Sequence, residues 1–552
     1  MRLLVSWGQL LGTYSGGLFL VPVIDLFAGP GGLGEGFSSL IDREGKPVFQ
    51  IVLSIECDQT AHQTLRMRSF FRKLTQKYGK APHEYHQYIA NPTDQSLEKL
   101  KAVSPELWES ANEEALCAEL VERDNSLVEL GRKRLENAGV KEGSPWVLIG
   151  GPPCQAYSLV GRSRRTNDKE GLERDKKQTL YKCYLAFIRK LKPTVFVMEN
   201  VKGLLSASHK GERVFARICS DMEKAGYRIY SLAKENPTDP RDYIVKAEEY
   251  GIPQKRHRVI LVGVRKRGKR KPGTLSPSTP ITLREALEGI PAVRSGFSNR
   301  NNDLNDERWQ EYIQGAAKRI LNFGEGADLK NILGCFEEGP FPTAMSDNTA
   351  SNNMSRYASW YRGRMEPFIT LPNHTARPHL AADLVRYLFC AAYAEKNGRP
   401  AHITDFPKDL YPNHKNVRNL KKGEAMKFPD RFRVQIWDEP STTITSHIAK
   451  DGHYYIHPDP RQCRSLTVRE AARLQTFPDD YFFEGERTSQ YTQVGNAVPP
   501  LLAQQIAKVV ATYLDIETWG FCDSLISVYD DQNVLSDKDN RLFVAVASSQ
   551  QE

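Results

Sequence analysis

Short apolar runs recur through the first 290 residues of the chain, and most are closed by glycine or a charged residue. Runs of this length with branched and aromatic side chains are typical of buried strands. They span residues 21–27, 48–55, 146–149, 194–198 and 258–264. Amphipathic stretches with helical spacing lie between them, for example at 34–40 and 178–191. Strands that alternate with helices predict an α/β fold, in which helices cover both faces of a mostly parallel sheet.

Two regions depart from this alternation. Residues 59–145 form a polar stretch with helical patterning, clearest at 105–139, and we expect a helical insertion on the surface. After a last helix at 282–289, the chain is irregular, polar and rich in Asn, Pro, His and Arg to about residue 463. The pattern predicts a first domain over 1–290, a smaller second domain over 291–485, and a return to the first domain over 486–552.

Composition narrows the class of protein. The 552 residues are 40% hydrophobic and 26% charged, which is typical of a globular protein. Nine cysteines are scattered without a CxxC pair, which favours a reducing compartment and argues against structural zinc. The net charge of +9 is weak support for a polyanionic partner. We expect residues 1–20 to be a peripheral extension or an overlong start rather than a membrane segment, because the early apolar stretch runs directly into the first strand. We also expect the protein to be cytoplasmic.

A glycine-rich turn follows the first strand. Residues 29–34 read GPGGLG, which satisfies GxGxxG between a strand and a helix, and Glu56 ends the next strand. Glycines let a ligand approach the backbone closely, and an acid at that place can accept hydrogen bonds from ribose hydroxyls. The alternative is a turn required only for packing. Asp25 and the Phe-Ala-Gly that follows it favour S-adenosylmethionine over a dinucleotide.

A second turn, GPPCQ over residues 151–155, follows the strand at 146–149 and presents one thiol, Cys154. In open α/β sheets this carboxyl edge is where ligands bind, and the two prolines restrict the backbone before the thiol. Cys154 could therefore be a nucleophile, although a lone cysteine is more often buried and inert.

Two further motifs end or begin strands. Glu199 follows the strand at 194–198 and could bond or protonate a ring nitrogen, with a structural ion pair as the alternative. Residues 254–258 read QKRHR, where Arg256 and Arg258 could contact phosphate and base, with a solvated loop as the alternative. The basic run at 265–271 adds charge near the same region, more as solvated surface than as a specific contact.

Together and in this order, these motifs resemble those of the cytosine-C5 DNA methyltransferases. RSLTVREAARLQTFP at 464–478 is similar to the motif that organises the recognition domain, and QVGNAVPP at 493–500 to the motif that closes the cofactor pocket. The resemblance covers roughly residues 21–58, 146–290 and 430–515. It implies a Rossmann-like S-adenosylmethionine-dependent methyltransferase sheet with a second, smaller DNA-recognition domain.

The resemblance also assigns roles to residues. The catalytic residues would be Cys154, Glu199, Arg258 and Arg256. The cofactor-binding residues would be Asp25, Phe27, Ala28, Gly29, Gly31, Gly32, Glu56, Leu180, Asn496 and Val498. The DNA-binding residues would be Gln155, Ser158, Arg256 and Arg258. S-adenosylmethionine would donate the methyl group without a metal, and a monomer would act on double-stranded DNA after flipping out the target cytosine.

The chain departs from the family pattern at two places. Cys57 stands where an aromatic residue often stacks on the adenine, and the acidic motif after the third strand cannot be placed within 59–145. Base reading would fall to the region 291–463, and a hydroxyl-rich segment at 442–447 could touch the DNA backbone. The polar candidates for base reading, each more often structural than functional, are Asn373, His374, Arg377, Asn413, His414 and Lys415.

Three alternatives remain open at this point. An RNA (tRNA) cytosine-5 methyltransferase would share the motifs, but the large region 291–463 favours duplex DNA. A Rossmann-fold oxidoreductase would leave Cys154, Glu199 and Arg258 unexplained. An inactive DNA-binding regulator would not need them. The absence of recognisable regulatory domains in the sequence suggests a bacterial or phage enzyme, in a restriction-modification or other phage-defence system or as an orphan.

Overall fold

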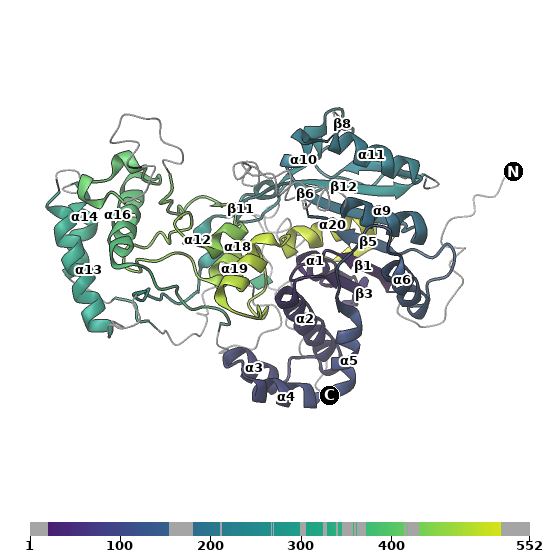
Figure 1. Cartoon of the computed structure of the whole chain (residues 1–552), viewed down its shortest axis with the longest axis horizontal. Coiled ribbons are helices and arrows are strands. Elements are labelled where there is room, and N and C mark those ends of the chain that lie inside the picture. Colours follow the sequence, from purple (N-terminus) through teal and green to yellow (C-terminus); the bar gives the residue numbers. More distant parts are fainter. Residues whose placement is uncertain are drawn as a thin grey trace, which may run out of the picture.

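Figure 1 shows the computed structural model of the chain. The residues that it describes are 20–153, 180–209, 212–266, 268, 270–298, 305–323, 328–337, 341–344, 357, 360–361, 371–412, 417 and 430–519. The predicted residues that lie outside these ranges are 1–19, Cys154, Gln155, Ser158, Asn413, His414, Lys415 and the tail from 520.

An eight-stranded sheet forms the centre of the molecule. Its strands are β1 (Val21–Leu26), β3 (Phe49–Glu56), β4 (Ala115–Cys117), β5 (Val147–Gly150), β6 (Val195–Val201), β9 (Tyr227–Ser231), β10 (Ile244–Lys246) and β12 (His257–Arg265). The order is β10-β12-β6-β5-β1-β3-β4, and β9 also pairs with β12. Strands β6, β5, β1, β3 and β4 are parallel, whereas β12 runs antiparallel to its neighbours. The predicted mostly parallel sheet is therefore confirmed.

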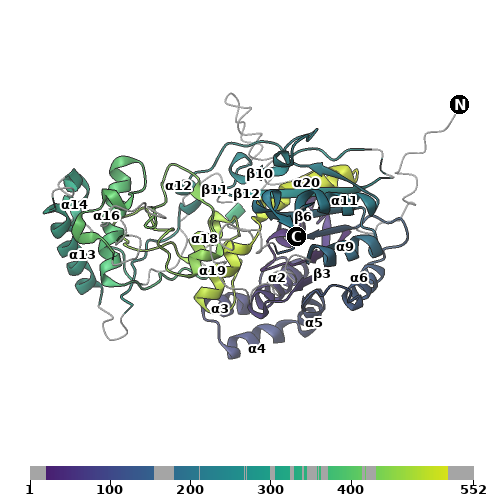
Figure 2. The same cartoon turned by 45° about the horizontal axis from the view of Figure 1, so that its top comes forward.

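Helices cover both faces of the sheet (Figure 2). Helices α1 (Gly32–Ser38) and α20 (Pro500–Tyr513) pack on one face, and α6 (Ser126–Asn137), α9 (Leu180–Leu191) and α11 (Val214–Lys224) pack on the other. Successive strand side chains point to opposite faces, so a fully apolar run is expected where both faces are covered. In β5, the side chains of Val147 and Ile149 join the first of these two cores, and Leu148 joins the second.

The stretch 59–145 is not the surface insertion that we expected. It contains α2 (Gln59–Tyr78), α3 (His83–Ala90), α4 (Asp94–Val103), α5 (Pro105–Glu114), β4 and α6. Strand β4 pairs with β3 at the edge of the central sheet, and α2 buries half of its residues. The stretch at 105–139 is therefore two helices separated by a strand. Apolar side chains of α2 to α5 form a further core with Phe482, and α6 packs on the central sheet.

The second region lies at one end of the molecule, on the left in Figure 1. Helix α12 (Leu283–Leu287) ends just before this region, and the helices within it are α13 (Asp306–Leu321), α14 (Lys330–Leu333) and α16 (Ala381–Asn397). A separate apolar core joins the last three of these helices to the segment that ends near Cys463. Helices α18 (Val468–Leu474) and α19 (Arg487–Asn496) instead share a core with α12. The separate core thus ends near residue 463, before the predicted boundary at 485.

Shorter elements complete the described chain. They are β2 (Ile41–Asp42), α10 (Gly203–Ser206), β7 (Ser208–His209), β8 (Glu212–Arg213), η4 (Pro240–Tyr243), η5 (Ala247–Glu249), β11 (Gln254–Lys255), η7 (Gly334–Glu337), η8 (Ile403–Asp405), η9 (Lys408–Leu410), β13 (Ser441–Thr442), η10 (Ser446–Ala449) and β14 (Thr518–Trp519). Among the described residues, none of the helices is both long enough and apolar enough to cross a membrane.

Candidate active site

The glycine turn between β1 and α1 is held against the end of β3. The Gly29 amide donates to Glu56 Oε2 at 2.8 Å, and Glu56 Oε1 accepts from the Asp58 amide at 2.8 Å. Phe27 and Gly29 both have φ of 57°, a left-handed backbone that a non-glycine residue adopts at a cost and that recurs at ligand sites. A side chain built on Gly29 would meet no atom within 4 Å. Open space therefore lies beside the backbone at the place where the sequence predicts a ligand.

The last motif reaches the same turn from the far end of the chain. A Cβ atom on Gly32 would overlap the Val498 carbonyl oxygen, so only glycine allows this approach. Asn496 is exposed at the end of α19, and Leu180 is partly exposed at the start of α9. The structure therefore brings the last motif into contact with the glycine turn, at Val498 and Gly32.

Asp25 lies beneath the turn, in the last part of β1. It is fully buried, and its carboxyl oxygens have no well-formed hydrogen bond among the described residues. Burial raises the pKa of Asp25 to about 8, the nearby Glu56 charge adds to the rise, and a contact with the Gly34 amide offsets only part of it. Asp25 therefore lies buried behind the turn, near the Gly34 amide, and carries a proton at neutral pH.

A carboxylate and a guanidinium meet at the same carboxyl edge of the sheet. Glu199, near the end of β6, forms an ion pair with Arg258, with Glu199 Oε1 2.9 Å from Arg258 Nε, and both side chains are largely buried. The antiparallel register pairs Arg258 with Val201, which places the start of β12 beside the end of β6. This pair can present a charged donor and a carboxylate to one planar ring.

The turn that leads to Cys154 lies against this pair. A Cβ atom on Gly151 would lie 3.2 Å from Glu199 Oε2, and Asn200 Nδ2 donates to the Pro152 carbonyl at 3.1 Å. Cys154 itself lies outside the described residues. The position of residues 151–153 nevertheless places the beginning of the predicted nucleophile loop beside Glu199.

Arg256 does not point toward this edge, which differs from the predicted catalytic and DNA contacts. It is 2% exposed, and its guanidinium donates to the carbonyls of Ile444 at 2.8 Å and Ala497 at 2.7 Å. Burial and the neighbouring Arg258 charge lower the pKa of Arg256. Its contacts indicate a structural link between β12, the 441–446 segment and α19.

The described residues of the basic run at 265–271 also lie away from the site. Because β12 is antiparallel to β6, its end lies at the opposite edge of the sheet from Arg258. Arg265 donates to the Pro193 carbonyl, and Arg270 pairs with Asp515. The strand direction separates two basic segments that adjoin in the sequence.

Comparison with known proteins identifies the family. The family model described as C-5 cytosine-specific DNA methylase matches residues 122–512, more than half of the chain. The chain belongs to this family. Its function is therefore methylation of cytosine C5 in DNA, and the family implies the use of S-adenosylmethionine.

Three curated relatives illustrate the match. The chain is 34% identical over 509 residues to the type II methyltransferase M.Bpa9945I of Bacillus paralicheniformis, covering 88% of this chain and 98% of the relative. It is 27% identical over 420 residues to the type II methyltransferase M.AgeI of Thalassovita gelatinovora, covering 69% and 86%. It is 28% identical over 424 residues to the DNA (cytosine-5-)-methyltransferase M.ApeKI of Aeropyrum pernix, covering 69% and 84%.

Three of the polar base-reading candidates have structural contacts in this methyltransferase. His374 is 3% exposed, with Nδ1 bonded to the Thr467 hydroxyl and Nε2 to the Pro291 carbonyl. Asn373 bonds the backbone of Phe483 in both directions. Arg377 donates to the carbonyls of Ile448 and Lys450. These contacts agree with the structural alternative for each of them.

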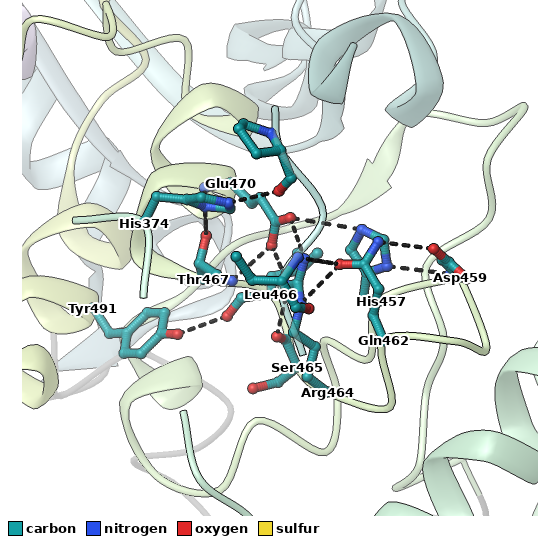
Figure 3. Close-up of polar contacts among 12 residues, drawn as sticks. His374, His457, Asp459, Gln462, Arg464, Ser465, Leu466, Thr467, Glu470 and Tyr491 are labelled. Carbon is teal, nitrogen blue, oxygen red and sulfur yellow. Dashed lines mark hydrogen bonds and ion pairs between the residues drawn. The ribbon is translucent and has the colours of Figure 1, made fainter. Parts of the chain in front are cut away.

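Buried charges hold the start of α18 in the methyltransferase against the segment that precedes it (Figure 3). Arg464, which is 0% exposed, donates to both oxygens of Glu470 at 2.6 Å. Glu470 also accepts from the Thr467 amide and caps α18. Burial alone would raise the pKa of Glu470, but the Arg464 charge, the neighbouring His457 and His374 and the hydrogen bonds from Arg464 together outweigh it and lower the pKa. Burial lowers the pKa of His457 to about 4. The start of the motif at 464–478 is thus held by a satisfied, buried ion pair rather than by exposed groups.

The third strand of the sheet reveals an acidic residue that the sequence did not place. Glu119 lies two residues after β4 and is exposed. Burial and the Glu56 charge raise the pKa of Cys57 to about 11, and the Glu119 charge adds to the rise. The amide of Ala118, the residue before Glu119, donates to the Glu56 carbonyl at 3.0 Å, so Glu119 lies near the end of β3. The sequence pattern that would have predicted β4 was weak, because this strand is only three residues long and lies among charged helices. Within the described parts of the methyltransferase, no group of three or more His, Cys, Asp and Glu side chains is placed to hold a metal ion.

Proposed function

We propose that this methyltransferase modifies a specific duplex DNA sequence, using Cys154 as a covalent nucleophile, as the modification enzyme of a restriction-modification system. One observation supports the catalytic assignment above all others. The glycine turn with Glu56, the Glu199–Arg258 pair and the turn at 151–153 all lie at the carboxyl edge of one sheet. Ligands of open α/β sheets bind at this edge.

The pocket beside Gly29 fits S-adenosylmethionine. The open space at Gly29 admits a ligand close to the backbone, and the Glu56 carboxylate, already held by two backbone amides, can accept from ribose hydroxyls. Val498, which lies between α19 and α20, would cover the pocket. Glu119 would accept from the adenine amino group. When bound there, S-adenosylmethionine supplies an electrophilic methyl group.

The chain's own residues would then activate the cytosine. The Cys154 thiolate bonds to C6 of the flipped-out base, and the electrons of the C5–C6 double bond become available for C5 to accept the methyl group. Glu199 would hold a proton at N3, and Arg258 would bond the base carbonyl, so that the pair stabilises the charge that develops on the ring. Loss of the C5 proton then allows the C6–S bond to break and frees Cys154.

The biological setting follows from the relatives, which are named type II methyltransferases. We expect a monomer that acts on DNA beside a cognate restriction endonuclease. The RNA alternative is not favoured, because the matching family is one of DNA methylases. Methyl transfer to duplex DNA and to transfer RNA, measured side by side, separates the two substrates directly.

The decisive experiment is bisulfite sequencing of DNA from cells that express the chain. Wild-type protein should yield 5-methylcytosine within one short sequence, and Cys154→Ala should yield none while retaining S-adenosylmethionine binding. Cys335→Ala is the matched control, because Cys335 is an exposed thiol in the recognition region. Methylation by Cys154→Ala at the wild-type rate would exclude the proposed nucleophile. Soluble wild-type protein without 5-methylcytosine in the DNA would contradict the proposed substrate.

A further inference from the structure

A buried tyrosine far along the chain contacts the cofactor turn. Tyr481 is 0% exposed, and its hydroxyl donates to the Pro30 carbonyl. The next amide, Gly31 N–H, donates to the Ala28 carbonyl at 2.9 Å. The peptide between Pro30 and Gly31 is therefore held at both its oxygen and its nitrogen. A Cβ atom on Gly31 would lie 2.9 Å from the Tyr481 hydroxyl oxygen, which shows how closely the tyrosine approaches the turn.

An arginine fixes Tyr481 relative to the first helix after the turn. Arg68 of α2 lies over the Tyr481 ring at 4.6 Å and donates to Asp480 Oδ1 at 2.8 Å. It also donates to both oxygens of Glu35 on α1, with Nε to Oε2 at 2.9 Å. Arg68 is 5% exposed, so water screens these contacts little. Arg68 thus connects Tyr481 and Asp480 to α1, the helix that follows the turn.

The backbone around Tyr481 is equally constrained. Arg469 of α18 donates to the carbonyls of Pro478 at 2.9 Å and Tyr481 at 2.5 Å. Tyr85 donates to the Asp480 carbonyl at 2.8 Å. Burial raises the pKa of Tyr481, so its hydroxyl remains a donor at any working pH. The Tyr481 hydroxyl donates to the Pro30 carbonyl, in the same turn whose Gly29 amide donates to Glu56.

We propose that Tyr481 is a positioning residue for the cofactor: its hydroxyl holds the Pro30–Gly31 peptide in the shape that receives S-adenosylmethionine. The inference rests on the cofactor pocket proposed above. It adds a residue from the segment after α18, which otherwise belongs to the junction with the recognition region. Tyr481 acts through the turn and does not need to contact the cofactor.

The chain offers a matched control for the test. Tyr491, labelled in Figure 3, is also 0% exposed and donates its hydroxyl to a backbone carbonyl, that of Leu466 at 2.6 Å. Tyr481→Phe and Tyr491→Phe therefore remove the same chemical group from equally buried rings. Calorimetric binding of S-adenosylmethionine, its KM and kcat, and the thermal midpoint are measured for both variants and the wild type.

Tyr481→Phe should weaken S-adenosylmethionine binding about five-fold, which corresponds to ~1 kcal/mol. KM should rise similarly, with kcat at saturating cofactor nearly unchanged, because ground state and transition state lose the same contact. Tyr491→Phe should leave cofactor affinity at the wild-type value. Equal affinities in the two variants, or a fall in kcat without a change in KM, would overturn the positioning role.

Two further variants keep the outcome interpretable. Glu56→Gln should weaken cofactor binding; wild-type affinity in this variant would instead reject the proposed pocket and the inference with it. Weak binding by Glu56→Gln together with wild-type binding by Tyr481→Phe overturns the positioning role alone. If Tyr481→Phe does not fold, Asp480→Asn decides the matter, because it loosens the Arg68 anchor but keeps the hydroxyl. Weaker cofactor binding by folded Asp480→Asn supports the role, and unchanged binding overturns it.

Discussion

Replacing Arg256 with methionine tests whether this residue holds the structure together or contacts DNA. Methionine keeps an unbranched apolar side chain, shorter than that of arginine, and donates no hydrogen bond. The change leaves the buried carbonyls of Ile444 and Ala497 without their short contacts of 2.8 and 2.7 Å. Each unsatisfied buried acceptor costs about 1–3 kcal/mol, and removal of a buried charge offsets part of this loss. We expect the free energy of unfolding to fall by about 2–4 kcal/mol.

Urea denaturation measures this change, and Lys255→Met is the control. Lys255 is the preceding residue, but its side chain is exposed and pairs with Glu439, so its loss should change stability by less than about 1 kcal/mol. DNA affinity is then measured over a range of salt concentrations at a temperature where Arg256→Met is folded. The salt dependence should match the wild type, because Arg256 would make no phosphate contact. Wild-type stability with a salt slope reduced by about one unit would refute the structural assignment.

Three other changes test separate parts of the fold. Gly36→Ala drives a Cβ atom into the carbonyl of the first residue of α20 and should destabilise the protein by about 1–3 kcal/mol. Gly315→Ala, at a position in α13 where a Cβ atom meets open space, should instead stabilise the protein by up to about 1 kcal/mol. Urea unfolding that ranks the two variants in the reverse order would contradict the packing argument. Asp25→Asn should be more stabilising at high pH than at low pH. The folded state keeps the Asp25 proton up to about pH 8, whereas the unfolded state loses it near the ordinary aspartate pKa of 3.8, so wild-type stability falls as pH rises through that window. Parallel pH profiles of the thermal midpoint for the variant and the wild type would exclude this cause. Glu470→Gln leaves buried Arg464 without its counter-charge and should lower the free energy of unfolding, measured in urea, by about 3–5 kcal/mol. A decrease below about 1 kcal/mol would show that the ion pair is not needed for stability.

The strands that carry the candidate site could be predicted because their signals are local. Apolar runs followed by turn residues placed Glu56, Glu199 and Gly151 at strand ends, and the structure has each of them at the same sheet edge. Strand β4 could not be predicted in this way. Its three residues form a strand only because β3 offers a free edge to pair with. The helices around it therefore suggested a surface insertion.

The sequence by itself determined the order of the motifs, the alternating α/β pattern and the kinds of side chain available for the chemistry. Tertiary structure decided which of them meet. The antiparallel direction of β12 placed Arg258 against Glu199 and the basic run at the other edge of the sheet. Packing of the 441–446 segment and α19 buried Arg256. Such outcomes depend on contacts between residues far apart in the chain, and local periodicity carries no information about those contacts.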